Sequence, residues 1–246
     1  MLSPNSFFDL EGYKHKHIFD GCAFVWEAIS KIGQYIMVYA TENDDAKRNA
    51  IKGKVLPGAF IDNGAGIYVG EGSIVEPGAF IQGPCIIGRN CQVRSGAYIR
   101  GNVITGDDCI IGHTSELKNA IMLNHSQAPH FNYVGDSILG SYVNLGCGTI
   151  CSNVPLVSFK DRATGKRPPI ILKIDGKAYN TGLAKFGAVV GDNTETGCNT
   201  VLNPGCLVGK NCRIYPGTSL PKGYYGDAQM IKLRQTSEFA PRNDLN

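Results

Sequence analysis

The chain has 246 residues, with 24 basic and 21 acidic side chains and 31 glycines. Because the charges nearly balance, the composition does not favour a general nucleic-acid-binding protein. The N-terminus has no basic stretch followed by an apolar run, and no segment reads as a membrane span, so we expect a cytoplasmic protein. Nine cysteines occur without a Cys-x-x-Cys motif, and five of them stand at small-residue positions of a repeat, which favours buried, reduced thiols.

Residues 1–52 form the first predicted unit, an N-terminal helical cap. Apolar residues recur at helical spacing between Phe19 and Ala40, and Asp20 is a suitable N-cap residue. Because a solenoid must protect the end of its stack from water, we expect this helix to cover the first coil of the unit that follows.

A six-residue repeat dominates residues 53–222. Between Val69 and Leu123 almost every sixth residue is aliphatic, and a second column, four residues further on, holds small side chains. Neither a helix nor an ordinary strand has a period of six, whereas a parallel β-helix built from hexapeptides does. The predicted fold class is therefore an all-β solenoid, a parallel β-helix whose coils stack about 4.8 Å apart.

Two interruptions divide the repeat. A change of register falls in Gln127–Asn132, after which the aliphatic column restarts at Tyr133. Residues 159–183 form an insertion, in which Asp175-Gly176 between two strand-like runs predicts a β-hairpin with a type I′ turn. The repeat then resumes, and residues 223–246 are expected to form a polar C-terminal tail.

Arg100 and Lys118 are 18 residues apart, so they should lie one above the other on neighbouring coils. Two stacked cations repel each other unless an anion lies between them, and a phosphate group would suit both. The alternative is that both side chains extend into water or pair with Glu116, and the spacing alone does not decide between these arrangements.

Of the five histidines, His130 is the strongest candidate for chemistry because it lies in the register change, close to Tyr133. His125 and His130 are five residues apart, which also suggests a three-histidine zinc site of the γ-class carbonic anhydrase type. The third histidine would be needed about two coils earlier, near Arg89, and none occurs there. We therefore expect no metal site.

The segment from Ala97 to Asn153 resembles the acetyltransferase domain of the bifunctional N-acetylglucosamine-1-phosphate uridylyltransferase/glucosamine-1-phosphate acetyltransferase, a hexapeptide-repeat acyltransferase family. The family pattern is an Arg, a Lys one coil later, His-x-x-Tyr, then Val-Asn-hydrophobic-Gly-x-Gly-Thr and a nearby Asn. The matching residues here are Arg100, Lys118, His130, Tyr133, Asn144 and Asn153. The likeness covers roughly residues 55–220.

The resemblance implies a role for each matched residue. His130 would be the general base, and Asn144 would help to hold the sugar and the reacting amine. The residues implied to bind the sugar phosphate are Arg100, Lys118, Tyr133, Asn144 and Lys185. The residues implied to line an acetyl-CoA groove are Cys147, Asn153, Cys198 and Pro216.

The same resemblance implies a left-handed β-helix and a homotrimer with active sites between subunits. Residues 1–52 hold no counterpart of the nucleotidyltransferase half, so no uridylyltransferase activity is expected. The predicted function is acetyl-CoA-dependent N-acetylation of glucosamine-1-phosphate or galactosamine-1-phosphate, in the synthesis of UDP-N-acetylglucosamine and cell-envelope precursors, without a metal. The alternatives are an acyltransferase acting on a nucleotide sugar or another amine, and a non-catalytic trimeric scaffold.

Overall fold

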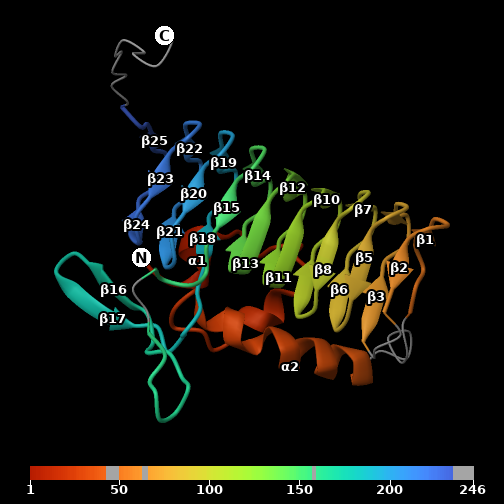
Figure 1. Ribbon diagram of the computed structural model, residues 1–246, viewed down its shortest axis with the longest axis horizontal. Helices are drawn as coiled ribbons and strands as arrows, with labels where there is room; N and C mark the ends of the chain where they lie inside the picture. Colours follow the sequence, from red (N-terminus) through yellow and green to blue (C-terminus); the bar gives the residue numbers. More distant parts are fainter. Residues whose placement is uncertain (43–49, 63–65, 157–158, 235–246) are drawn as a thin grey trace, which may run out of the picture.

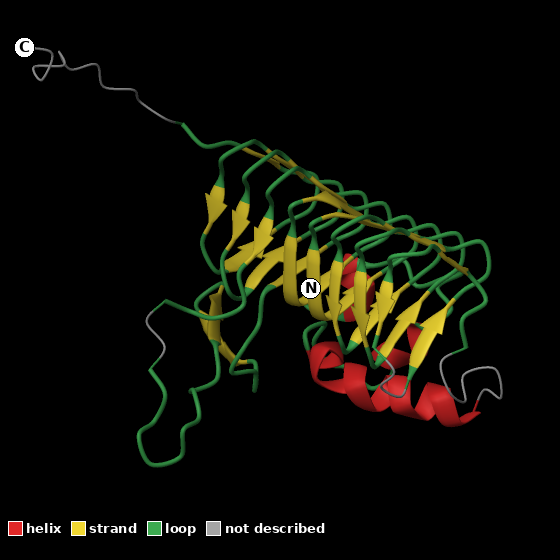
Figure 2. Ribbon diagram, turned by 45° about the vertical axis from the view of Figure 1, so that its right-hand side comes forward, coloured by secondary structure: helices red, strands yellow, loops and turns green. Residues whose placement is uncertain are grey.

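The computed structural model describes residues 1–42, 50–62, 66–156 and 159–234. Within these ranges the chain winds into a long three-sided prism of short strands, with one long helix against its side (Figures 1 and 2). Each strand of the prism pairs in parallel with the strands one coil before and after it. The predicted parallel β-helix of hexapeptide repeats is thus confirmed, and the six-residue period fits its left-handed form.

Face 1 of the prism is a nine-stranded sheet. Its strands are β1 (Lys54–Val55), β4 (Ile74–Val75), β7 (Gln92–Val93), β10 (Ile110–His113), β12 (Gln127–His130), β14 (Asn144–Leu145), β19 (Glu195–Thr196), β22 (Arg213–Ile214) and β25 (Met230–Ile231).

Faces 2 and 3 belong to one further sheet, because two long strands run through both of them. The strands of face 2 are β2 (Phe60–Ile61), β5 (Phe80–Gln82), β8 (Tyr98–Arg100), the first halves of β11 (Glu116–Met122) and β13 (Tyr133–Leu139), β15 (Ile150–Cys151), β20 (Val201–Leu202) and β23 (Ser219–Leu220). The strands of face 3 are β3 (Ile67–Val69), β6 (Cys85–Ile87), β9 (Val103–Thr105), the second halves of β11 and β13, β18 (Ala188–Val190), β21 (Cys206–Val208) and β24 (Gly223–Tyr225).

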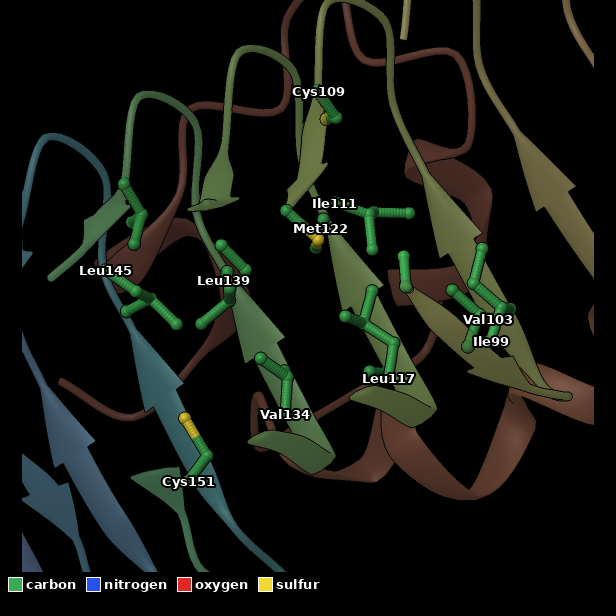
Figure 3. Packing of buried hydrophobic residues seen from close by; sticks show 14 of the residues in the cluster. Ile99, Val103, Cys109, Ile111, Leu117, Met122, Val134, Leu139, Leu145 and Cys151 are labelled. Atoms are coloured by element: carbon green, nitrogen blue, oxygen red, sulfur yellow. The ribbon is translucent and has the colours of Figure 1, made fainter. Parts of the chain in front are cut away.

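Aliphatic side chains fill the inside of the prism. Figure 3 shows Ile99, Leu117 and Val134, which come from successive coils of face 2 and point into the same interior. All three are fully buried, as are the small residues beside them, such as Cys109. Close packing of one large and one small side chain in each hexapeptide explains why the repeat needs both columns.

The register change lies earlier than the sequence pattern predicts. The next large inward residue after Leu117 is Met122, five positions on, whereas Leu123 packs outside the prism. The corner between them is the single residue Asn119 at a φ of 49°, in place of the two-residue corner Gly101-Asn102 of the preceding coil. The prediction was wrong because Leu123, also aliphatic, hides the shortened step at the six-residue spacing.

The N-terminal segment lies along face 3 instead of over the first coil (Figure 2). It consists of α1 (Pro4–Phe7), the 3₁₀ helix η1 (Lys16–Phe19) and α2 (Glu27–Glu42). On face 3 the residue before each inward residue is also apolar, for example Ile86, Ile104 and Ile121, and α2 buries these side chains together with Trp26. The helix therefore covers the face whose outer side would otherwise expose apolar surface to water.

The long helix begins at Glu27 and not near Asp20. Asp20 follows the end of η1, where its N–H donates to the carbonyl of His17 at 3.2 Å. Gly21, at a φ of 69°, then turns the chain out of any helical path. The carboxylate of Glu27 accepts the N–H of Phe24 at 3.2 Å and so satisfies a donor just ahead of the helix.

The predicted β-hairpin is present in the insertion. It pairs β16 (Ile171–Ile174) with β17 (Lys177–Asn180) in antiparallel fashion. Asp175 and Gly176 have φ values of 48° and 74°, as a type I′ turn requires. Leu172 and Ile174 are buried in the apolar cluster that includes the N-terminal segment, and the ring of Tyr179 packs against Phe24 and Trp26 of that segment. The hairpin is thus anchored on its own subunit.

The prism continues past the predicted end of the β-helix. β24 and β25 add a further coil as far as Ile231, because Tyr225 and Ile231 still pack against the core. Residues 235–246 of the expected tail lie outside the described residues. No helix in the described ranges is long and apolar enough to cross a membrane.

The buried His15 makes the stability of the folded chain depend on pH. Its ring is 2% exposed, and its Nδ1 lies 3.2 Å from the hydroxyl of Tyr35 on α2. Burial, followed by the charge of Lys14, lowers the pKa of His15 from 6.5 to about 4. The folded protein therefore resists a proton that the unfolded chain binds below pH 6.5, and stability is lost as the pH falls through this window.

We expect the free energy of unfolding to be roughly 2 kcal/mol lower at pH 5 than at pH 7.5 because of this one group. Urea denaturation at the two pH values measures the difference. His15→Phe keeps a ring in place and should lose less stability on acidification. His17→Phe, which changes an exposed neighbour, should respond like the wild type, and equal responses in both variants would contradict the assignment to His15.

Candidate functional site

One column of stacked residues runs along the corner between faces 1 and 2. Backbone hydrogen bonds join its coils. The N–H of the residue after each column member donates to the carbonyl of the column member one coil below. These bonds run from Phe131 to His113 (2.9 Å), Gly148 to His130 (3.0 Å), Asn199 to Cys147 (2.8 Å) and Gly217 to Cys198 (2.8 Å). The stacked residues, here called the histidine column, are His113, His130, Cys147, Cys198 and Pro216.

The histidine column brings four residues with predicted roles into line. His130, the predicted base, stands one coil below Cys147, which is half-buried, and two coils below Cys198, which is exposed. Pro216 comes next, and a Cβ atom added to Gly197 would collide with its ring, which shows how tightly these coils stack. The predicted base therefore lies at one end of the predicted cofactor groove.

A buried asparagine holds the corner that displays His130. The side-chain oxygen of Asn132 accepts the N–H of His130 at 3.0 Å, and its amide nitrogen donates to the carbonyl of Gly146 at 2.8 Å. Ser115, one coil below, accepts the N–H of Asn132 at 3.1 Å. The imidazole of His130 is exposed and has no hydrogen-bond partner among the described residues, whereas that of His113 is 2.7 Å from the carbonyl of Ser95.

The predicted pair Arg100 and Lys118 does stack on face 2. Glu116 pairs with Tyr98 and Leu117 with Ile99, which places Lys118 over Arg100. Nη1 of Arg100 lies 2.7 Å from Oε1 of Glu116, so the arginine adopts the pairing with Glu116 that the sequence left open. Lys118 has no carboxylate within 4 Å in the described part of the chain. The cluster therefore offers one unpaired positive charge.

The ring of Tyr133 lies next to Gly135, the residue that pairs with Lys118 in the next coil. A Cβ atom on Gly135 would come within 2.7 Å of ring atoms Cε1 and Cζ of the tyrosine, so only glycine leaves room for the ring. Burial, and then the charges of Glu116 and Asp136, raise the pKa of the Tyr133 phenol. The phenol thus stays protonated at neutral pH and can donate a hydrogen bond beside the lysine.

Asn153 and Lys185 lie at the two ends of the inserted segment. The N–H of Phe186 donates to the carbonyl of Asn153 at 3.0 Å, which closes the segment at its base. Asn153 is 8% exposed, and its side-chain nitrogen donates to the carboxylate of Asp136. Lys185 is exposed next to this closure. The two predicted ligands are therefore brought close together, although 32 positions separate them in the sequence.

Asn144 stands apart from the other predicted residues. It lies exposed on β14 of face 1, where it pairs with Gln127 on one side and Glu195 on the other. Because Gln127 precedes His130 by three residues, Asn144 is not in the histidine column. The predicted contact between Asn144 and the reacting amine stays a prediction.

The alternative metal site is not assembled. His125 lies at a different corner of the prism, between faces 1 and 3, where its ring stacks on Tyr142 at 4.5 Å. His125 is 3.9 Å from Asp108 and is not grouped with His130. The described ranges contain no cluster of three or more His, Cys, Asp or Glu side chains able to hold a metal ion.

Sequence reasoning missed Asn132 and Asp136, since neither belongs to a recognised motif. One signal for Asn132 was available. It stands 17 positions after Ser115, in the column that otherwise holds small residues, and a buried amide in such a place must have partners to satisfy it.

The chain is similar to several known proteins over part of its length. The family model described as the GMPPB C-terminal domain matches residues 81–161, and the bacterial transferase hexapeptide (six repeats) matches residues 187–222. The bifunctional protein GlmU of Methanococcus vannielii is 43% identical over 101 residues, which are 41% of this chain and 22% of that protein. A bifunctional sugar-1-phosphate nucleotidylyltransferase/acetyltransferase of Sulfurisphaera tokodaii is 35% identical over 107 residues, 44% of this chain and 24% of that protein.

A longer match extends the similarity to most of the chain. The bifunctional protein GlmU of a Picosynechococcus strain is 26% identical over 171 residues, which are 70% of this chain and 28% of that protein. The chain thus covers only about a quarter of the length of the relatives it matches. Over the region that it shares with them, the chain resembles the acetyltransferase part of these bifunctional enzymes, as its sequence motifs predict.

Proposed function

We propose that the chain is an acetyl-CoA-dependent N-acetyltransferase that acts on an amino-sugar 1-phosphate, glucosamine-1-phosphate or galactosamine-1-phosphate, on the route to UDP-N-acetylglucosamine and cell-envelope precursors. The observation that carries the proposal is the histidine column. In it the imidazole of His130, without a partner among the described residues, stands in line with Cys147, Cys198 and Pro216 and lies around one corner from Lys118 and Tyr133. The similarity to a sugar-1-phosphate nucleotidylyltransferase/acetyltransferase supports the same substrate class.

On this proposal, face 2 binds the acceptor. Lys118 pairs with the phosphate, and the phenol of Tyr133 donates a hydrogen bond to the same group. Arg100 contributes by sharing its guanidinium between Glu116 and the phosphate, since its five N–H donors can serve more than one anion. Binding the phosphate at this fixed place directs the sugar amine towards the corner that carries His130.

His130 acts as the general base at this corner. The amine nitrogen attacks the thioester carbonyl carbon, and His130 takes the proton that the nitrogen loses as the new C–N bond forms. The C–S bond then breaks, and the leaving sulfur receives a proton to give the free thiol of CoA. Histidine side chains commonly serve both as general base and as general acid in such proton transfers.

We also propose that the chain forms a homotrimer, as its resemblance to the acetyltransferase family implies. Face 3 is covered by α2, whereas faces 1 and 2 have no covering helix among the described residues. Exposed Phe60 and Phe80 stand on the first coils of face 2, which fits burial against a neighbouring subunit. Light scattering on purified protein measures the oligomeric state directly.

Thiol release from acetyl-CoA tests the proposed function. Four acceptors are compared at equal concentration: glucosamine-1-phosphate, galactosamine-1-phosphate, free glucosamine and UDP-glucosamine. Release with one or both sugar phosphates, and not with glucosamine, supports the proposal. Release with UDP-glucosamine alone would keep an acyltransferase but replace the acceptor, and phosphosugar binding without any release would favour the non-catalytic scaffold.

Replacing His130 should slow the chemical step. We expect His130→Ala to lower kcat by about 10²–10⁴-fold, the usual contribution of a general base, with the fold intact. His113→Ala is the matched control, because His113 stacks directly on His130 but bonds to the backbone of Ser95. Steady-state kinetics of both variants measure the effect. Full turnover in His130→Ala would remove this residue from the mechanism.

Replacing Lys118 should weaken acceptor binding. A charge-assisted hydrogen bond to phosphate is worth about 1.5–3 kcal/mol, so Lys118→Ala should raise the KM for the sugar phosphate roughly ten- to a hundredfold. The KM for acetyl-CoA should change little. Lys173→Ala, which removes an exposed lysine from the hairpin, serves as the control. A rise in the KM for acetyl-CoA alone would contradict the role assigned to Lys118.

Adding a methyl group at Gly135 should disturb the same subsite without removing a polar group. Gly135 does not have a positive φ, so alanine is compatible with its backbone. The new Cβ displaces the ring of Tyr133, and we expect Gly135→Ala to raise the KM for the acceptor about as much as Tyr133→Phe does. The double variant should be no worse than either single variant, because both changes remove one hydrogen bond. Additive effects would show that the ring and the glycine act separately.

A further inference from the structure

Asp136 is a buried carboxylate at the corner where β13 turns from face 2 to face 3. It is 7% exposed and has a φ of 45°. Its Oδ1 accepts a hydrogen bond from the side-chain nitrogen of Asn119, one coil below, at 2.8 Å. Its Oδ2 accepts one from the side-chain nitrogen of Asn153, one coil above. Three successive coils are thus joined by side chains at this single corner.

A buried negative charge without a positive partner is costly to keep. No Lys, Arg or His side chain lies within 4 Å of Asp136 in the described ranges, so two neutral amides alone satisfy it. Two coils earlier, Gly101-Asn102 makes the corresponding turn without a carboxylate. Local costs of this kind concentrate at functional sites.

The carboxylate decides which way the amide of Asn153 faces. An ionised carboxylate can only accept hydrogen bonds, so the nitrogen of Asn153 must face Asp136 and the oxygen must face the other way. The oxygen of Asn153 is therefore left for a donor outside the corner, such as an amide N–H of the pantetheine arm of acetyl-CoA.

Asp136 also touches the base of the insertion. Its carbonyl accepts the N–H of Gly187 at 2.9 Å, and the carbonyl of Asn153 accepts the N–H of Phe186. Lys185 directly precedes this pair of bonds. Asp136 is therefore linked to Asn153 through its side chain and to the strand that follows Lys185 through its backbone.

We propose that Asp136 is a positioning residue for the proposed acetyl transfer, one that fixes the side-chain amide of Asn153 so that its oxygen receives an N–H group of the pantetheine arm. This inference rests on the proposed function. Asp136 itself touches no substrate, and its effect is on the KM and dissociation constant for acetyl-CoA, with kcat changed less.

Three variants separate orientation from mere support of the fold. Asp136→Ala removes both hydrogen bonds, and we expect the KM for acetyl-CoA to rise about tenfold or more. Asp136→Asn keeps the shape, but either Asn119 or Asn153 must now turn its amide. If both arrangements are populated about equally, the apparent affinity for acetyl-CoA falls only about twofold.

The double variant Asn119→Asp/Asp136→Asn should again fix the orientation of the Asn153 amide. The new carboxylate at 119 accepts the nitrogen of the amide at 136, whose oxygen must then face Asn153. Asn153 is forced back into its original orientation, and an aspartate tolerates the left-handed backbone at 119. The double variant should therefore regain the wild-type KM for acetyl-CoA even though residue 136 no longer carries a charge.

Asp192→Ala is the matched control for stability. Asp192 is another buried aspartate, 5% exposed, whose carboxylate accepts the N–H groups of Asp9 and Ser141 at 2.6 and 2.7 Å at a different corner. Its replacement should lower the melting temperature while leaving the KM for acetyl-CoA unchanged. A rise in KM for this variant equal to that of Asp136→Ala would mean that both changes act only through the fold.

The measurements are steady-state kinetics and calorimetric titration with acetyl-CoA for the wild type and each variant. A wild type that neither binds acetyl-CoA nor releases thiol overturns the proposed function, and this inference with it. A wild type that binds, with Asp136→Ala binding equally well, overturns the inference alone. Failure of Asn119→Asp/Asp136→Asn to restore affinity, in a folded protein, would show that the charge at 136 matters and not the orientation of Asn153.

Discussion

The stacking of one coil directly on the next is the constraint on which the whole structure depends. At a spacing of about 4.8 Å each residue of a coil lies over the equivalent residue of the coil below, so the allowed residue types are set by these columns of stacked residues. Inward columns must be aliphatic or small, and some corner columns must be glycine: a Cβ on Gly88 or Gly106 would collide with the next coil. The same rule builds the site, because residues distant in sequence, such as Cys147 and Cys198, become neighbours only by belonging to one column.

Two shortened corners set the middle of the prism apart. At Asn119 and at Asp136 a single residue with positive φ turns the chain, so β11 and β13 run without a break from face 2 to face 3. Glu116 consequently pairs with Tyr133, 17 positions later, whereas Tyr98 in the coil before pairs with Glu116 at an offset of 18. Because each corner has one residue fewer, β11 and β13 continue through it, and the polar side chain of Asn119 or Asp136 lies at the corner. The departures from the regular repeat therefore coincide with the candidate site, and they supply the network through which Asp136 acts.

Much of the fold could be predicted, because the six-residue repeat identifies the positions whose side chains point into the prism. The covering of face 3 could also have been anticipated from Ile86, Ile104 and Ile121, whose apolar side chains point away from the core. The position of the shortened corner could not, since Asn and Asp often adopt a positive φ but also occur at many positions that do not require one. At the site, the motif singles out Arg100, Lys118, His130 and Tyr133, and the spacing correctly predicts that Lys118 stacks on Arg100; the roles of these residues stay predictions. The pairing of Arg100 with Glu116 and the burial of Asp136 depend on side-chain geometry that no spacing contains.

The inserted segment leaves the columns intact on both sides of it. Ile150 pairs with Val201 and Asn144 with Glu195, so the coil that contains the insertion closes in register despite its length. Closing so long a loop costs little more entropy than closing a short one. Burial of Leu172 and Ile174, together with the packing of Tyr179 on Phe24 and Trp26 of the N-terminal segment, offsets that cost. That segment also covers face 3. One apolar cluster therefore fixes the N-terminal helix, the hairpin and the outer side of β11 and β13, and the residues on the inner edge of the insertion, Asn153 and Lys185, gain their fixed positions from packing on the far side of the molecule.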